Sequence, residues 1–128
     1  MTDAISAAQS ALGALSTSMA VTANNVANVN TDGYKSQDAR LSTGPDGQGT
    51  QVSSIVEDTS AGALRAETVA AENQAGVYEP QMDMVEMSNV DLVRQNVNMI
   101  QDSRAFEANV AVIRTADDMA GTLLDLRV

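Results

Sequence analysis

The first thirty residues of this chain contain eight positions spaced alternately by three and four residues, and all but one are apolar. This spacing predicts a long amphipathic helix, over about residues 3–29, that packs on a partner helix through a heptad seam. Gly13 lies inside this helix, where glycine is unfavourable, so we expect close packing at that point. The seam positions are Ile5, Ala8, Leu12, Leu15, Met19, Thr22, Val26 and Val29.

The last forty residues predict the partner helix, over about residues 89–126. Ser88 to Asp91 resembles a capping box, with Ser88 as the N-cap. At 1.5 Å per residue this helix would span about 57 Å, against about 40 Å for the first. Its apolar positions form two neighbouring stripes, so one partner helix leaves apolar surface for other molecules to cover. One stripe is Phe106, Val110, Ile113, Ala120 and Leu124; the other is Val112, Ala116, Met119, Leu123 and Leu126.

The middle of the chain has a weaker pattern. An asparagine-rich stretch followed by Asp32-Gly33 predicts a helix end near residue 29 and a turn at 31–33. Two short segments, 39–42 and 51–56, flank a Gly/Pro-rich loop and predict a β-hairpin. For residues 59–87 we expect a mostly extended connector, the alternative for 63–72 being a short helix.

The predicted fold class is therefore mainly α. Two long terminal helices, within residues 1–33 and 88–128, form a coiled-coil-like core. Residues 34–87 supply a small β-hairpin module and the connector between them.

Composition removes most kinds of catalysis. The chain has no cysteine and no histidine, which excludes disulfides, the common zinc sites and histidine-based triads. Asp117 and Asp118 are adjacent carboxylates, but neighbours on a helix point about 100° apart and do not form an acid–base pair. The loop at residues 44–49 lacks the lysine and the following helix of a phosphate site. We expect no enzymatic activity, no catalytic residues, no cofactor or metal and no small-molecule substrate.

The charge and the N-terminus limit the partners and the route of export. A formal net charge of -10 disfavours nucleic acid and anionic membranes, which are also negative. Residues 1–20 lack a basic region, and polar residues interrupt their apolar positions, so no cleaved signal peptide is expected. No run of about 18 apolar residues is present, so the chain is not expected to span a membrane.

Two long motifs at opposite ends of the chain resemble the signatures of bacterial flagellar rod and hook axial proteins. The N-terminal motif is SMAVTANNVANVNTDGYK, residues 18–35. The C-terminal motif begins with EMSNVDLV, residues 86–93, and continues through residues 98–100, 104–109, 112–113, 115–119 and 123–124. The motifs occur in the order found in that family, which makes the resemblance specific.

The resemblance implies a structural subunit of the flagellar basal-body rod, which assembles with copies of itself and related axial proteins into a helical tubular drive shaft for motility. In that family the terminal helices pair and line the inner tube, and the middle forms an outer β module. Subunits pass through the flagellar type III export apparatus, without a cleaved signal peptide, and form the periplasmic rod. The chain is short, like the proximal-rod members of the family. Its residues 30–35 and 88–92 are more similar to the corresponding motifs of distal-rod and hook proteins. The axial position therefore stays open.

Two alternatives come from other classes. A cytoplasmic helical adaptor or flagellar export chaperone would use the same amphipathic helices to bind a client protein. A carboxylate-based hydrolase, of a muramidase-like kind, would need two acids held in one cleft.

The candidate functional residues fall into two groups. The assembly seam is expected to pack against other subunits, and the helix-end junction is expected to shape the connection between the helical core and the β module. The assembly seam consists of Ile5, Leu12, Leu15, Met19, Val26, Val97, Ile100, Phe106, Val110, Ile113 and Leu123. The junction consists of Asn24, Asn25, Asn28, Asp32 and Gly33.

Overall fold

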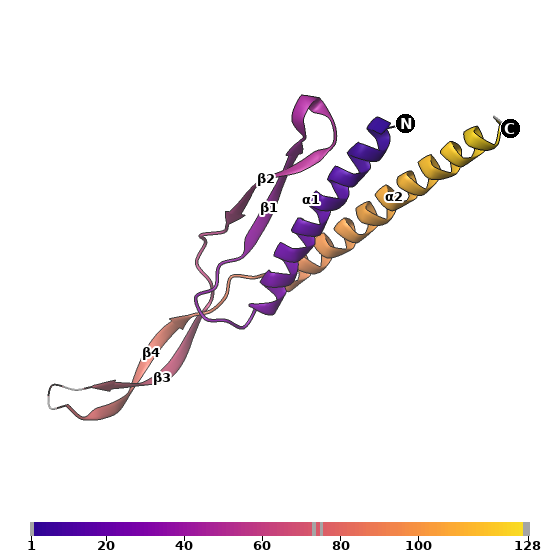
Figure 1. Ribbon diagram of the computed structural model, residues 1–128. Helices are drawn as coiled ribbons and strands as arrows, with labels where there is room; N and C mark the ends of the chain where they lie inside the picture. Colours follow the sequence, from indigo (N-terminus) through magenta and orange to yellow (C-terminus); the bar gives the residue numbers. More distant parts are fainter. Residues whose placement is uncertain (1, 73, 75, 127–128) are drawn as a thin grey trace.

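The computed structural model describes residues 2–72, 74 and 76–126. The elements are α1 (Thr2–Ala27), β1 (Gln37–Thr43), the short 3-10 helix η1 (Pro45–Gly47), β2 (Thr50–Glu57), β3 (Leu64–Glu72), β4 (Tyr78–Glu86) and α2 (Leu92–Asp125). The helices, of 26 and 34 residues, lie side by side and antiparallel, with both chain ends at the same end of the molecule (Figure 1). The predicted fold class is confirmed: two long terminal helices with a small β module between them.

Three heptad positions belong to the buried side of α1, which also contains Ala14, Val21 and Asn25 from outside the predicted seam. Ala8, Leu15 and Thr22 are only 3%, 7% and 4% exposed. Ala8 and Ala14 on α1 and Ala116 on α2 are also buried, and such small side chains let two helix backbones approach closely. The remaining seam positions are half-buried: Ile5, Leu12, Met19, Val26 and Val29.

Gly13 does not mark a close approach. It lies on the exposed side of α1, and a Cβ added there would meet no atom within 4 Å. The expectation of tight packing at this residue was therefore wrong.

The predicted start of the second helix was also wrong. The N-cap is Asp91, whose Oδ1 accepts hydrogen bonds from the backbone N–H groups of Val93 (2.9 Å) and Arg94 (3.3 Å). Ser88 caps only the local turn, where its Oγ accepts from the N–H of Val90 at 3.3 Å. Residues 88–90 cannot be helical because Asn89 is held in an extended segment, its N–H donating to the carbonyl of Tyr34 at 3.3 Å.

The predicted hairpin is confirmed as β1 and β2, which pair antiparallel and lie along α1 (Figure 1). Its tip is attached to the helix, because the N–H of Thr50 donates to the Oγ of Ser10 at 3.1 Å. Gly49 has a φ of 68°, and a Cβ there would collide with the Ser10 side chain. Glycine is therefore required at this contact on two grounds.

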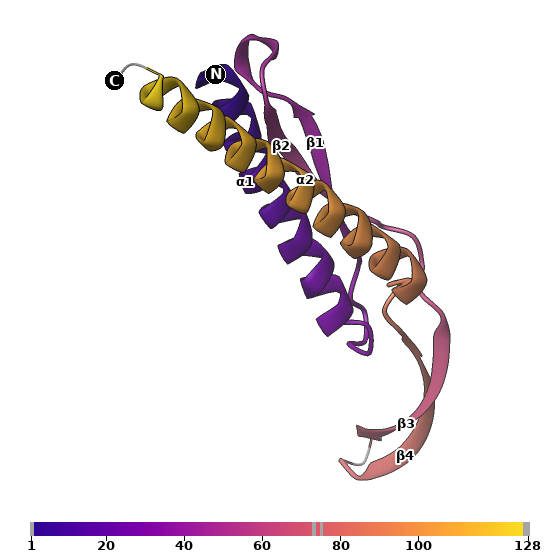
Figure 2. The same cartoon turned by 90° about the vertical axis from the view of Figure 1, so that its right-hand side faces the viewer.

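Residues 59–87 do not form the expected connector or short helix. They contain a second antiparallel hairpin, in which β3 and β4 pair without a bulge from Leu64↔Glu86 to Glu72↔Tyr78. β3 is rich in Ala and Glu, which favour helices in isolation, so its extended form depends on pairing with β4. Figure 2 shows this hairpin projecting beyond the end of the helix pair that is opposite the chain termini.

Candidate assembly surfaces and the junction that orients them

A single buried amide joins three elements of the fold. Asn25 is 0% exposed. Its Nδ2 donates to the carbonyl of Gln37 on β1 (2.7 Å) and to the Oε1 of Gln95 on α2 (3.1 Å). Its Oδ1 accepts from the N–H of Gln37 (2.9 Å) and the hydroxyl of Tyr34 (3.0 Å). An amide group has two donors and room for two acceptor bonds, so Asn25 is fully satisfied and fixes α1 relative to β1 and α2.

The other asparagines stabilise the end of α1. Asn28 Nδ2 donates to the carbonyl of Asn24 (2.9 Å) and to its Oδ1 (3.1 Å), and Asn24 Nδ2 donates to the hydroxyl of Tyr34 (3.1 Å). Burial raises the pKa of Tyr34 above its ordinary value, and the nearby charge of Glu57 adds to this shift. The structure thus brings the three predicted asparagines together, with Asn25 making the bonds between elements.

A lysine–glutamate pair fixes the root of the second hairpin. Lys35 Nζ lies 2.6 Å from Glu86 Oε1, which also accepts from the N–H of Gly62 at 2.7 Å. The same ammonium donates to the carbonyl of Ser60 at 2.8 Å. The bonds from Lys35 and Gly62, followed by the positive charge of Lys35, hold the pKa of the Glu86 carboxyl below its ordinary value.

Asn89 ties the segment before α2 to both hairpins. Its Oδ1 accepts from the N–H of Ser36 (2.7 Å), and its Nδ2 donates to the carbonyls of Asp58 (2.8 Å) and Ser60 (3.0 Å). Hydrogen bonds from Ser60 to the Asp58 carboxylate lower the pKa of that group. Three segments distant in sequence therefore meet at one hydrogen-bonded junction.

The predicted turn residues also belong to this junction. Asp32 Oδ2 lies 3.1 Å from the guanidinium of Arg65 on β3, which also contacts Glu67 at 3.1 Å. Gly33 has a φ of 69°, and its N–H donates to the carbonyl of Glu86 at 2.7 Å.

Sequence reasoning missed several partners at the junction, namely Tyr34, Lys35, Gln37, Glu86, Asn89 and Gln95. The available signal was that most of them lie inside the two terminal motifs, residues 18–35 and 86–93. Their pairing across the chain was not visible from local pattern.

The two helices differ in how much of their apolar surface is covered. On α2, Phe106, Val110 and Ile113 are half-buried on the side of α1. Val97 and Ile100 are 47% and 62% exposed, on the opposite side of the helix. The residues of the predicted seam therefore fall into two groups. Those on α1 pack within the chain, whereas Val97 and Ile100 on α2 do not.

Two groups of exposed residues on α2 are distinguished by their position on the helix. The outward strip faces away from α1, since its members lie on the opposite side of the helix from the buried Gln95 and Ala116. It consists of Val93, Val97, Ile100, Arg104 and Ala108. The terminal overhang lies near the end of α2 and consists of Leu123, Leu124 and Leu126, which are 54%, 70% and 78% exposed.

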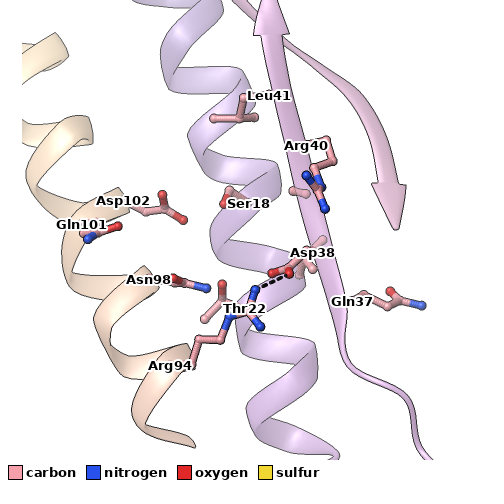
Figure 3. A pocket seen from close by; sticks show the side chains of 12 residues that line it. Ser18, Thr22, Gln37, Asp38, Arg40, Leu41, Arg94, Asn98, Gln101 and Asp102 are labelled. Carbon is pink, nitrogen blue, oxygen red and sulfur yellow. Dashed lines mark hydrogen bonds and ion pairs between the residues drawn. The ribbon is translucent and has the colours of Figure 1, made fainter. Parts of the chain in front are cut away.

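A cleft of about 350 Å³ lies between α1, β1 and α2. Figure 3 shows Arg94 of α2 reaching across it to Asp38 of β1, where the guanidinium and the carboxylate are 2.9 Å apart. Asp102 also borders the cleft, and its Oδ2 is buried with no hydrogen-bond partner in the structure. Among the described residues no group of three or more acidic, histidine or cysteine side chains is arranged to hold a metal ion.

No helix in the described part of the chain is long and apolar enough to cross a membrane. The features that stand out are a hydrogen-bonded junction, a paired helical core and apolar surfaces that no other described residue covers. Together they define a structural subunit of the kind that packs into larger assemblies.

Comparison with known proteins identifies the family. The family described as "Flagella basal body rod protein" matches residues 5–35, and the one described as "Flagellar basal body rod FlgEFG protein C-terminal" matches residues 82–126. The flagellar basal-body rod protein FlgC of Salmonella typhimurium is 35% identical over 127 residues, covering 88% of this chain and 87% of the relative. FlgC of Escherichia coli O6:H1 is similar to the same extent. The chain belongs to the flagellar basal-body rod protein family.

A hook protein is also similar, over a smaller part of its length. The flagellar hook protein FlgE of Borreliella burgdorferi is 33% identical over 73 residues, which are 57% of this chain and 16% of the hook protein. The two family matches contain both sides of the Asn25–Gln95 and Lys35–Glu86 contacts. The junction is therefore built largely from the segments that define the family.

Proposed function

We propose that this chain, as a structural subunit of the flagellar rod, assembles by burying the exposed apolar surfaces of α2 against copies of itself and related axial proteins. The observation that supports this proposal is the exposure of Val97, Ile100 and Leu123 on a helix whose partner α1 is already packed. Burying one large apolar side chain contributes about 1.5–3 kcal/mol, so several such residues per subunit favour association strongly.

The geometry of such packing suits a filament. The outward strip and the terminal overhang are different surfaces, so each meets a different surface of a neighbour. Contacts of this heterologous kind extend into helical arrays when the rotation between subunits does not close a ring. The junction around Asn25 would keep the β module at a fixed angle to the helices in every copy.

The finer parts of the proposal concern location and chemistry. We infer that the subunit leaves the cytoplasm through the flagellar export apparatus without a cleaved signal peptide, and that its place is the periplasmic rod. We also infer that it has no catalytic role, since its relatives are flagellar basal-body rod proteins. The position of the FlgC relatives within the rod fits this chain best, because the alignment spans 87% of their length.

Fractionation of hook–basal bodies tests the proposal. Detergent-purified hook–basal bodies from motile cells should contain the chain in fixed ratio to the other rod proteins, and a strain lacking the export apparatus should keep it in the cytoplasm. Deletion of the gene should leave cells without rods. Recovery only in the cytoplasm of motile cells, as a small defined oligomer, would favour the adaptor or export-chaperone function instead.

A further inference from the structure

The second hairpin is joined to the rest of the molecule at its root, where residues 58–63 lead into β3 and residues 86–91 follow β4. Among the described residues, β3 and β4 pack on each other and make no extended contact with α1, α2 or the first hairpin (Figure 2). At 3.3 Å per residue its nine-residue strands extend about 30 Å, so a turn of about 20° at the root moves the tip by about 10 Å. The contacts at the root therefore decide where the tip of the hairpin lies.

Residues 33–36, which connect α1 to β1, bond to both sides of this root. On the side that leaves the hairpin, the N–H of Gly33 donates to the carbonyl of Glu86 at 2.7 Å. On the side that enters it, the N–H of Asp58 donates to the carbonyl of Ser36 at 2.8 Å. One short segment thus holds both sides, and rotation of the hairpin would break bonds on each.

Lys35 is the side chain that joins the two sides. Its Nζ donates to the carbonyl of Ser60, before β3, at 2.8 Å and lies 2.6 Å from Oε1 of Glu86, at the end of β4. The same carboxylate oxygen accepts from the N–H of Gly62 at 2.7 Å. The side chains of the ion pair are 22% and 37% exposed, so water screens the pair less than it screens a fully exposed one.

The other ion pair at the root is more exposed. Arg65 and Asp32 are 47% and 40% exposed at their side chains, and Arg65 divides its guanidinium between Asp32 and Glu67. Exposed ion pairs contribute little because water and salt screen them. The Lys35–Glu86 pair is therefore the stronger of the two.

Gly62 allows the two sides of the root to approach closely. A Cβ at this position would collide with the carbonyl group of Met87 on the opposite side. The N–H of Met87 in turn donates to the carbonyl of Ala63 at 2.8 Å, so this backbone cannot move aside without breaking the bond. A larger residue at position 62 has to push the two sides apart.

Tyr34 connects the same segment to both helices. Its hydroxyl donates to Oδ1 of Asn25 on α1 at 3.0 Å, and its carbonyl accepts from the N–H of Asn89, just before α2, at 3.3 Å. Lys35 is the next residue in the chain. The contacts that hold the hairpin are thus continuous with those that hold the helix pair.

We propose that Lys35 and Gly62 are positioning residues of the second hairpin, which they hold at one angle to the helix pair in the free subunit. The hairpin is then oriented before any neighbour binds. An element that is ordered in advance loses less conformational entropy on association. That benefit to assembly rests on the proposed function, whereas the orientation is a property of the free subunit and is measured there.

Distances between two spin labels test the orientation, and the absence of cysteine lets labels be attached at chosen sites alone. The test pair is Gln81→Cys on β4 with Asn96→Cys on α2, both at exposed positions. The control pair is Ser54→Cys on β2, in the first hairpin, with Asn96→Cys. Double electron–electron resonance is recorded on the dilute, purified full-length chain with the natural root, with Lys35→Met and with Gly62→Ala.

With the natural root, the test pair should give one distance distribution as narrow as that of the control pair. Lys35→Met and Gly62→Ala should each widen it by about twofold or more, because the hairpin then samples several angles. The control pair should not change, since the first hairpin lies along α1. A broad distribution with the natural root would overturn the fixed angle, and an unchanged distribution in either variant would overturn the role of that residue.

A third pair of labels separates orientation from folding of the hairpin. Val69 and Gln81 are opposite each other in the register, so labels at Val69→Cys and Gln81→Cys broaden each other's continuous-wave spectrum while the strands are paired. This broadening should persist in Lys35→Met and Gly62→Ala. Its loss would show that these residues are needed to form the hairpin and would overturn a positioning role. None of these outcomes depends on whether the chain is found in basal bodies.

Discussion

Asn25 Nδ2 donates to Gln95 Oε1 at 3.1 Å across 70 residues of sequence, and the side chain of Asn25 is wholly buried. The same Nδ2 atom also donates to the carbonyl of Gln37 on β1. One amide nitrogen thus joins α1 both to α2 and to the first hairpin. Because Asn25 is wholly buried and its Nδ2 is the donor to both acceptors, replacing the amide nitrogen leaves both bonds unmade.

The Asn25→Asp variant tests the loss of both bonds. It replaces the donating NH₂ with a carboxylate oxygen directed at two acceptors, Gln37 O and Gln95 Oε1. We expect the free energy of unfolding to fall by about 3 kcal/mol, because buried acceptors lose their partner and a charge is buried. Urea unfolding of the purified subunit, followed by far-UV circular dichroism, measures this. The control is Asn24→Asp on the exposed side of the same turn, and an equal loss in both variants would contradict the role of Asn25.

Acid should weaken the root of the second hairpin. The pKa of Glu86 is lowered in the folded protein from its ordinary value of 4.5. A carboxyl whose folded pKa is depressed stabilises the fold fully above its unfolded pKa, and this stabilisation is lost as the pH falls through the folded pKa. Unfolding free energy measured from pH 6 down to about pH 3 should therefore decline, and Glu86→Gln should make that decline shallower.

Part of the decline should remain in Glu86→Gln, because the pKa of Asp58 is lowered too, chiefly by its hydrogen bonds with Ser60. Asp118→Asn, at an exposed position of α2, removes one carboxylate outside the junction and is the matched control. If Glu86→Gln and the control give the same profile as the natural chain, the Lys35–Glu86 pair does not stabilise the folded state.

The sequence predicted the helices well because their signal is local. The alternation of three and four residues from Ile5 to Val26 requires only that α1 have a partner, and the structure supplies α2. The first hairpin was visible for the same reason, as two strand-like segments around a loop of glycines and Pro45. Each of these features is encoded within about thirty residues of chain.

The second hairpin and the junction depend on contacts between distant segments. β3 contains Ala66, Ala70 and Glu72, which suit a helix, and only pairing with β4 holds it extended. The start of α2 was misplaced because Asn89, which bonds to Tyr34 and Ser36, removes residues before Asp91 from the helix. Local propensity contains no information about such partners.

Gly13→Ala should stabilise the isolated subunit. Gly13 is in the middle of α1, and a Cβ there has free space around it. Alanine is favoured over glycine in a helix interior by about 1 kcal/mol, so we expect the unfolding free energy to rise by about that amount. Thermal and urea unfolding measure the change. A loss of stability in the dilute subunit would mean that a neighbouring group within the chain occupies this space.

Two aspartate substitutions separate folding from assembly. Leu15 is 7% exposed, so Leu15→Asp buries an unpaired charge, and we expect a loss of about 3–5 kcal/mol and no motility. Ile100 is 62% exposed, so Ile100→Asp should change the stability of the subunit by no more than about 0.5 kcal/mol. It should nevertheless stop swimming, because the outward strip would carry a charge into the packed rod. Asn96→Asp, on the same helix but outside the strip, should swim normally; motility of Ile100→Asp at the level of this control would show that the strip stays exposed in the rod.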